Sequence, residues 1–72
     1  MAAFARELGY TQVLSQTAHG QKVFSNGKDV ISFDVDGHNG GFWKLANDFK
    51  ALLSRKTRRG TFDPFLRRRV GD

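Results

Sequence analysis

The chain has 72 residues, near the lower limit for a domain that folds on its own hydrophobic core. It contains no cysteine, which excludes disulfides and thiolate metal sites, and no apolar run approaches the ~20 residues of a membrane span. The formal net charge is +5, and seven of the twelve basic residues lie between Arg55 and Arg69. This arginine-rich segment favours a nucleic acid partner over an anionic membrane, because it forms no amphipathic helix of membrane-binding length.

The first predicted elements are helical. Phe4 and Leu8 lie four residues apart, on one helix face, and Gly9 follows where a left-handed cap would end the helix. Thr11 is a candidate cap for a second helical turn. We therefore predict a helical segment over residues 1–18 that covers one side of a sheet.

Residues 22–36 are predicted to form a β-hairpin, with Asn26-Gly27 as its turn because both positions favour positive φ. A longer turn would change the cross-strand partners but not the alternation within the second strand. That alternation places Ser32, Asp34 and Asp36 on a polar face. The opposite, apolar face then holds Phe24, Ile31, Phe33 and Val35.

The next predicted strand covers residues 42–46, with Trp43 and Leu45 on one face and Phe42 and Lys44 on the other. A short helical insertion follows at residues 47–54. Asn47 is its candidate cap, and Phe49, Leu52 and Leu53 would share its apolar face.

Residues 59–63 are the last predicted inner strand, and Pro64 ends it. The basic tail, residues 65–72, can add an edge strand. The predicted fold class is therefore α+β, with a short N-terminal helical segment packed on a small twisted antiparallel β-sheet. The sheet is expected over residues 20–72 of a single domain that covers residues 1–72.

Residues 34–44, with the sequence DVDGHNGGFWK, combine two carboxylates, one imidazole, one ammonium and three glycines. Ordinary core strands and surface helices do not need this mixture, whereas a site that transfers protons beside a phosphate uses all of it. The glycines permit tight backbone geometry and close approach of a ligand. We therefore expect a nuclease centre in this stretch.

RNA carries its own nucleophile, the 2′-hydroxyl, so its cleavage needs a base, an acid for the leaving oxygen and cationic donors, and in principle no metal. Asp34 or Asp36 is the candidate base. Histidine has the ordinary pKa nearest neutrality, so His38 is the candidate acid. Lys44 and Arg59 would stabilise negative charge on the phosphate.

Other contacts to RNA are expected from hydroxyl, aromatic and arginine side chains. Thr61 would donate a hydrogen bond to a phosphate oxygen. Trp43 or Phe42 would stack an unpaired base, although Trp43 fits a core position more readily. His19, with no acid nearby in sequence, is assigned to a loop. The predicted phosphate- and RNA-binding set is Arg58, Arg59, Thr61, Arg67, Arg68, Arg69 and Trp43.

Two other classes of protein compete with a ribonuclease. Asp34, Asp36 and His38 could chelate a divalent cation, and His38-Asn39 matches the first half of a His-Asn-His DNA nuclease motif. That motif needs a further histidine, and none follows His38. A non-catalytic RNA-binding module would use the same arginines but would not need the acid and imidazole cluster.

The motifs also carry a family resemblance. DVDGHNGGFWK at 34–44, RGTFD at 59–63 and RVGD at 69–72 resemble the C-terminal nuclease domains of bacterial polymorphic and contact-dependent growth-inhibition toxins. Within that group, GTFDP at 60–64 is similar to the GSFDP segment of ribosome-cleaving colicins. The resemblance implies the barnase, EndoU, colicin and RelE type of fold.

The resemblance further implies a ribonuclease that cuts 16S ribosomal RNA near the decoding centre, with an active-site set of Asp34, Asp36, His38 and Lys44. It implies an acidic cognate immunity protein, and delivery as the C-terminal part of a larger secreted effector into the cytoplasm of a target bacterium. The colicins place a glutamate a few residues after the histidine, whereas here Phe42 stands four residues past it. Because other toxins of this fold cut tRNA, tRNA is the alternative target. We predict a monomeric, metal-independent endoribonuclease without a cofactor.

Overall fold

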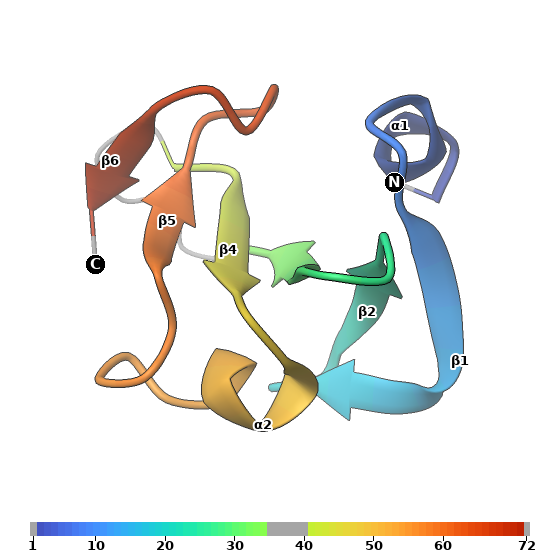
Figure 1. The fold of residues 1–72 in the computed structure, drawn as a ribbon, viewed down its shortest axis with the longest axis horizontal. Coiled ribbons are helices and arrows are strands. Elements are labelled where there is room, and N and C mark those ends of the chain that lie inside the picture. The colour runs from blue at the N-terminus through green and yellow to red at the C-terminus, as the bar shows by residue number, and fades with distance from the viewer. Residues whose placement is uncertain (1, 35–40, 72) are drawn as a thin grey trace.

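The computed structural model describes residues 2–34 and 41–71, and every structural statement below concerns these ranges. Six strands form one antiparallel sheet in which consecutive strands of the chain are neighbours, and two short helices accompany it (Figure 1). The predicted α+β class is confirmed. The elements are α1 (Ala2–Glu7), β1 (Thr11–Ala18), β2 (Gln21–Ser25), β3 (Val30–Phe33), β4 (Trp43–Ala46), α2 (Phe49–Leu52), β5 (Gly60–Phe62) and β6 (Arg69–Gly71).

The two faces of the sheet bury different clusters. On one face, which we call the α1 face, Ile31 and Trp43 pack with Ala5 of α1. On the other, the α2 face, Val30 and Leu52 belong to a second buried cluster. Successive residues of a strand point to opposite faces, which is why a single strand such as β3 contributes to both clusters. Neither described helix is long and apolar enough to cross a membrane.

The predicted helical segment over residues 1–18 is confirmed only for α1. Gly9 has a φ of 94°, so the predicted left-handed end of the first helix is correct. Residues 11–18 form β1 instead of a second helical turn, and the sheet therefore begins at Thr11. Leu14 on β1 is 86% exposed, so it does not cover the sheet.

Two hairpins precede the central strands. His19 and Gly20 join β1 to β2, and both have positive φ values of 51° and 81°, as a tight hairpin turn requires. The β2–β3 connection is longer than predicted, because Ser25 pairs with Val30. The side chain of Asn26 stabilises that connection by accepting hydrogen bonds from the N–H groups of residues 28 and 29, at 2.9 and 2.7 Å. The predicted two-residue turn is wrong, but the alternation along β3 is as expected.

The short helix α2 is capped one residue later than predicted. The Asp48 carboxylate accepts a hydrogen bond from the N–H of Ala51 at 2.8 Å, which makes Asp48 and not Asn47 the N-cap. Leu52 is fully buried on the α2 face, whereas Leu53 is 38% exposed and does not share that burial.

Replacing Asp48 by alanine is expected to lower the free energy of unfolding by about 1 kcal/mol, because the N–H of Ala51 loses its capping acceptor. Urea unfolding followed by circular dichroism measures this. Asn47→Ala, a matched neighbouring change, is expected to leave the unfolding midpoint unchanged. An equal loss in both variants would contradict the capping assignment.

The C-terminal predictions agree with the structure. The strand expected over residues 59–63 is β5, and the basic tail adds the edge strand β6. Gly60 has a φ of 129°, and a Cβ at this position would come within 2.7 Å of the Gly71 carbonyl oxygen. Glycine is therefore required at this position, where the paired strands β5 and β6 approach each other closely.

Candidate active site

The candidate site is built on a row of three residues that lie side by side across the sheet. Lys44 of β4 pairs with Ser32 of β3 on one side and with Thr61 of β5 on the other. Directly paired residues point to the same face, so the three side chains share the α2 face. Ser32 is 1% and Thr61 is 7% exposed, and Lys44 is half-buried. A single ammonium group is thus flanked by two buried hydroxyl residues.

Asp34 follows β3 and extends this polar row. Its N–H donates a hydrogen bond to the Phe42 carbonyl at 2.8 Å, which continues the β3–β4 pairing beyond the end of the strand. It stands two residues after Ser32, at the position that the alternation of β3 assigns to the α2 face, whereas Phe42, its partner across the pairing, packs on the α1 face. Lys44 is then a diagonal cross-strand neighbour of Asp34, at a separation of roughly 7–8 Å that a lysine side chain can span. Asp34 is only 6% exposed.

The predicted residues Asp36 and His38 lie outside the described residues. They follow Asp34 by two and four positions in the sequence and precede Gly41. Their assigned roles stay predictions. The alternative metal site needs the same two residues. No group of three or more histidine, cysteine or acidic residues that could hold a metal occurs within 2–34 and 41–71.

Trp43 belongs to the core. Its side chain is fully buried, and its indole N–H donates a hydrogen bond to the Pro64 carbonyl at 2.9 Å. The hypothesis that Trp43 stacks an unpaired base is therefore wrong. Phe42 also departs from its predicted position beside Lys44, because its ring packs edge-on against Phe4 of the α1 face at 5.7 Å between centroids.

Arg59 lies at the end of β5 away from Asp34. Its guanidinium is 3.4 Å from the Asp29 carboxylate, and this partly exposed pair contributes about 0–1 kcal/mol. Both residues lie near Tyr10. Burial raises the pKa of the Tyr10 hydroxyl, Asp29 adds to that rise, and Arg59 opposes it. Arg59 thus has an intramolecular partner outside the row of polar residues. Its predicted contact with phosphate stays a prediction.

The other arginines of the predicted RNA-binding set lie in three segments, before β5, between β5 and β6, and in β6. Arg58 is half-buried before β5, with its N–H bonded to the Ser54 carbonyl at 3.0 Å. Arg67 and Arg68 are exposed in the loop between β5 and β6, where the Asp63 carboxylate accepts hydrogen bonds from both of their N–H groups at 2.7 and 3.0 Å. The Arg69 side chain donates to the Arg59 carbonyl at 2.9 Å.

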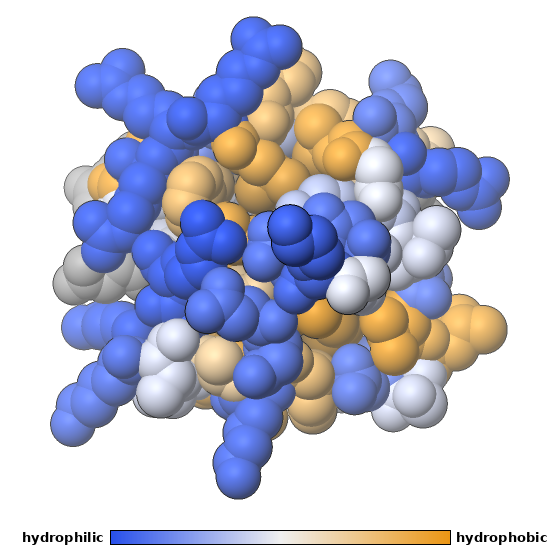
Figure 2. Space-filling model, in the orientation of Figure 1, coloured by the Kyte–Doolittle hydropathy of each residue, from blue (hydrophilic) through white to orange (hydrophobic). Residues whose placement is uncertain are grey.

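The loop of residues 63–68 lies at the same end of the sheet as Asp34. The N–H of Phe42, whose carbonyl binds Asp34, donates to the carbonyl of Phe62 at the end of β5. In Figure 1 this loop and the start of β4 meet at the top, while α2 lies at the bottom. Figure 2 shows long hydrophilic side chains that project over β5 and β6. The exposed arginines therefore border the end of the sheet where the acidic residue lies.

The sequence prediction missed Ser32 as a site residue, although its alternation with Asp34 had placed it on the polar face. Among the described residues, its Oγ is a buried polar atom without a hydrogen-bond partner. A buried hydroxyl without a partner costs free energy, and this one lies directly beside Lys44 in the row.

Comparisons with known proteins identify relatives of this chain. The family model described as Novel toxin 21 matches residues 3–72. The 16S rRNA endonuclease CdiA of Enterobacter cloacae subsp. cloacae is 41% identical over 51 residues, which are 71% of this chain but 1% of that protein. The structure is similar to a chain of the CdiA-CT/CdiI toxin and immunity complex from Enterobacter cloacae, with a TM-score of 0.69 and 36% identity over 99% of this chain and 92% of that chain. The chain belongs to the Novel toxin 21 family, which confirms the predicted resemblance to contact-dependent growth-inhibition toxins.

Proposed function

We propose that this chain is an endoribonuclease toxin domain that cuts 16S ribosomal RNA near the decoding centre. The observation that carries the proposal is the position of Lys44 between two buried hydroxyl residues, with Asp34 as its diagonal neighbour. Similarity to a protein named as a 16S rRNA endonuclease supports the choice of substrate. tRNA stays the alternative target.

The proposed reaction is attack of a ribose 2′-oxygen on the adjacent phosphorus. Asp34 or Asp36 takes the proton of the 2′-hydroxyl while the bond from that oxygen to phosphorus forms. His38 gives a proton to the 5′-oxygen as its bond to phosphorus breaks, which leaves a 2′,3′-cyclic phosphate and a 5′-hydroxyl. Lys44 neutralises charge on the non-bridging oxygens. No metal takes part in this scheme.

Hydroxyl groups complete the proposed phosphate site. Thr61 and Ser32 flank Lys44 on its two neighbouring strands, so a phosphate held by the ammonium would also lie within reach of a hydroxyl donor. The Ser32 hydroxyl oxygen is fully buried, so Thr61 is the proposed hydroxyl donor of the pair.

The proposal includes a partner and a route. An acidic immunity protein would block the site in the producing cell, and the solved structure that this chain resembles is a toxin and immunity complex. The chain corresponds to 1% of the length of the CdiA relative, which fits delivery as a small C-terminal part of a larger secreted effector. The domain would then act in the cytoplasm of the target bacterium.

The direct test is to induce the chain in bacteria and sequence the 5′ ends of total RNA. We expect one new 16S end near the 3′ terminus, which is absent from uninduced cells and still appears when the purified chain cuts ribosomes in EDTA. New ends confined to tRNA would transfer the proposal to the alternative target. Growth without any new RNA end would contradict ribonuclease activity.

Exposed arginines of the β5–β6 loop should contribute salt-dependent affinity for RNA. Arg68→Gln is expected to weaken binding and to lower the slope of log Kd against log salt concentration by about one, because one phosphate contact is lost. Fluorescence anisotropy at several salt concentrations measures the slope, with cleavage blocked by His38→Ala. Arg55→Gln, which removes the same charge from an exposed position between α2 and β5, is the matched control. Equal slopes for both variants would contradict the assignment.

A further inference from the structure

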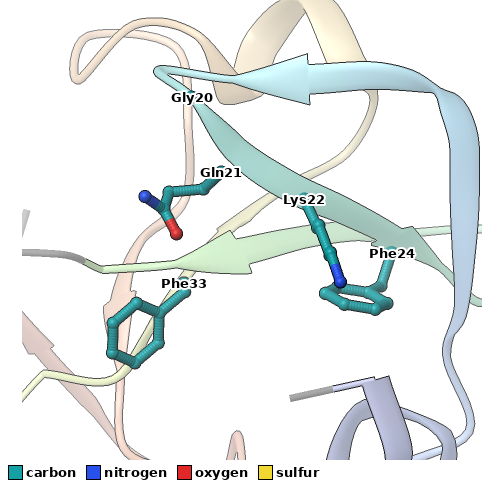
Figure 3. A pocket seen from close by; sticks show the side chains of 5 residues that line it. All are labelled: Gly20, Gln21, Lys22, Phe24 and Phe33. Carbon is teal, nitrogen blue, oxygen red and sulfur yellow. The ribbon is translucent and has the colours of Figure 1, made fainter.

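A cavity of about 260 Å³ lies on the α1 face, beside the strand that leads to Asp34. Its lining residues come from the start of β2 and from the end of β3 (Figure 3). It lies on the face opposite Ser32, because Phe24 and Phe33 occupy the apolar positions of their strands. The lining is formed by Gly20, Gln21, Lys22, Phe24 and Phe33.

The aromatic part of this cavity is held in place by the core. Phe33 packs edge-on against Phe42, with 5.1 Å between ring centroids. Phe24 is 1% exposed and packs edge-on against Trp43 at 6.0 Å. Only Phe33 retains appreciable exposure, so the cavity offers one fixed aromatic ring that a ligand can reach.

The rim of the cavity is polar. Figure 3 shows the Gln21 side chain extending from the start of β2 toward the end of β3, and the Lys22 side chain beside Phe24. An amide offers both donors and an acceptor, and an exposed ammonium attracts an anion. A planar ring, a hydrogen-bonding edge and a negative charge nearby are the three features of a nucleotide base with its phosphate.

The size of the cavity also points to a small planar ligand. Pockets for drug-sized molecules usually enclose ~300–1,000 Å³, and this cavity lies just below that range. It is therefore suited to one ring system and not to a folded peptide segment.

The position of the cavity connects it to the candidate active site. Phe33 and Asp34 are consecutive, so their side chains leave the sheet on opposite faces at the same end of β3. An RNA strand that passes around this end can place a phosphate beside Asp34 and Lys44 while a neighbouring base turns toward Phe33. Single-stranded RNA is commonly recognised in this way, with unpaired bases stacked on aromatic rings.

We propose that the cavity lined by Gln21, Lys22, Phe24 and Phe33 binds an unpaired nucleobase of the RNA next to the bond that is cut. This inference rests on the proposed ribonuclease function. Phe33 stacks on the base, Gln21 bonds its edge, and Lys22 pairs with the phosphate of that nucleotide.

The test uses the His38→Ala chain and a short unstructured RNA, with affinity measured by fluorescence anisotropy. Phe33→Leu removes the aromatic face and keeps apolar volume, so we expect a roughly tenfold loss of affinity, while Phe33→Tyr retains the parent affinity. Lys22→Gln is expected to weaken binding, whereas Lys28→Gln, the same charge change in the β2–β3 turn, does not. Circular dichroism and thermal unfolding establish that each variant is folded.

An abasic nucleotide, placed in turn at each position of the RNA, separates stacking from an indirect effect on the fold. At one position we expect the abasic site and Phe33→Leu to lower affinity by the same factor and to show no added loss together. Parent-like affinity of Phe33→Leu, or additive losses at every position, would overturn the proposal. The proposal would also be overturned if the Phe33→Leu chain bound RNA with the parent affinity and instead lost affinity for the immunity protein. These outcomes leave the proposed function standing if the unmodified chain still cuts 16S RNA, whereas absence of cleavage by that chain contradicts the function itself.

Discussion

His38→Ala is expected to lower the rate of RNA cleavage by about 10²–10⁴-fold, which is the usual contribution of a general acid or base. Without the imidazole, the 5′-oxygen would leave as an unprotonated alkoxide. The Kd for RNA should change little, because Lys44 and the arginines supply the affinity. Single-turnover cleavage of purified ribosomes measures the rate, and survival of bacteria after induction gives a cellular readout.

The second histidine provides the matched control for this prediction. His19 lies in the β1–β2 turn with positive φ, and its Nε2 is 2.9 Å from the Leu53 carbonyl oxygen. His19→Asn keeps a residue type that tolerates this backbone conformation, so the chain should fold and cleave normally. A His38→Ala chain that cleaves at the parent rate would contradict a catalytic role for His38. A folded His19→Asn chain that fails to cleave would indicate that the β1–β2 turn takes part in the reaction.

Lys44→Met is expected to lower the cleavage rate about 10²–10³-fold, the range found when one donor to a developing negative charge is removed. Methionine keeps a long unbranched side chain between Ser32 and Thr61, so the sheet should remain intact. Because the ammonium would act on the phosphate as charge develops, the loss should fall mainly on kcat. The rate and KM on ribosomes or on a short RNA separate the two effects.

Lys50→Met is the control for the lysine prediction. It makes the same chemical change at an exposed position of α2, on the opposite end of the domain from Asp34. We expect parent-like cleavage. Equal rates for Lys44→Met and Lys50→Met, with both chains folded, would show that the row across the sheet does not bind the reacting phosphate.

Much of the sheet was predictable because its pattern is local. The alternation of apolar and polar residues from Ile31 to Asp34 is maintained by burial on two faces, and a one-residue shift would expose the core. Residues 11–18 were mispredicted as helical for a related reason. β1 is an edge strand with an irregular register between Gln12 and Thr17, so its burial pattern gives no clear period of two.

The site residues whose positions were predicted wrongly are those placed by long-range packing. Trp43 and Phe42 are neighbours in sequence, and alternation alone predicted that they face opposite sides. The α1 helix supplies Phe4, whose ring contacts both of them, at 6.1 and 5.7 Å, and this tertiary contact draws Phe42 toward the core. The Arg59 contact with Asp29 joins residues 30 positions apart and could not be read from a local pattern.

The order of the strands has a consequence for how the domain acquires its structure. Because consecutive strands of the chain are paired, each pairing requires closure of only a short or moderate loop. No strand pairs with a segment that is distant in sequence. Low sequence separation between contacting residues favours rapid folding. A chain of this topology is suited to regain its activity quickly after it has been unfolded.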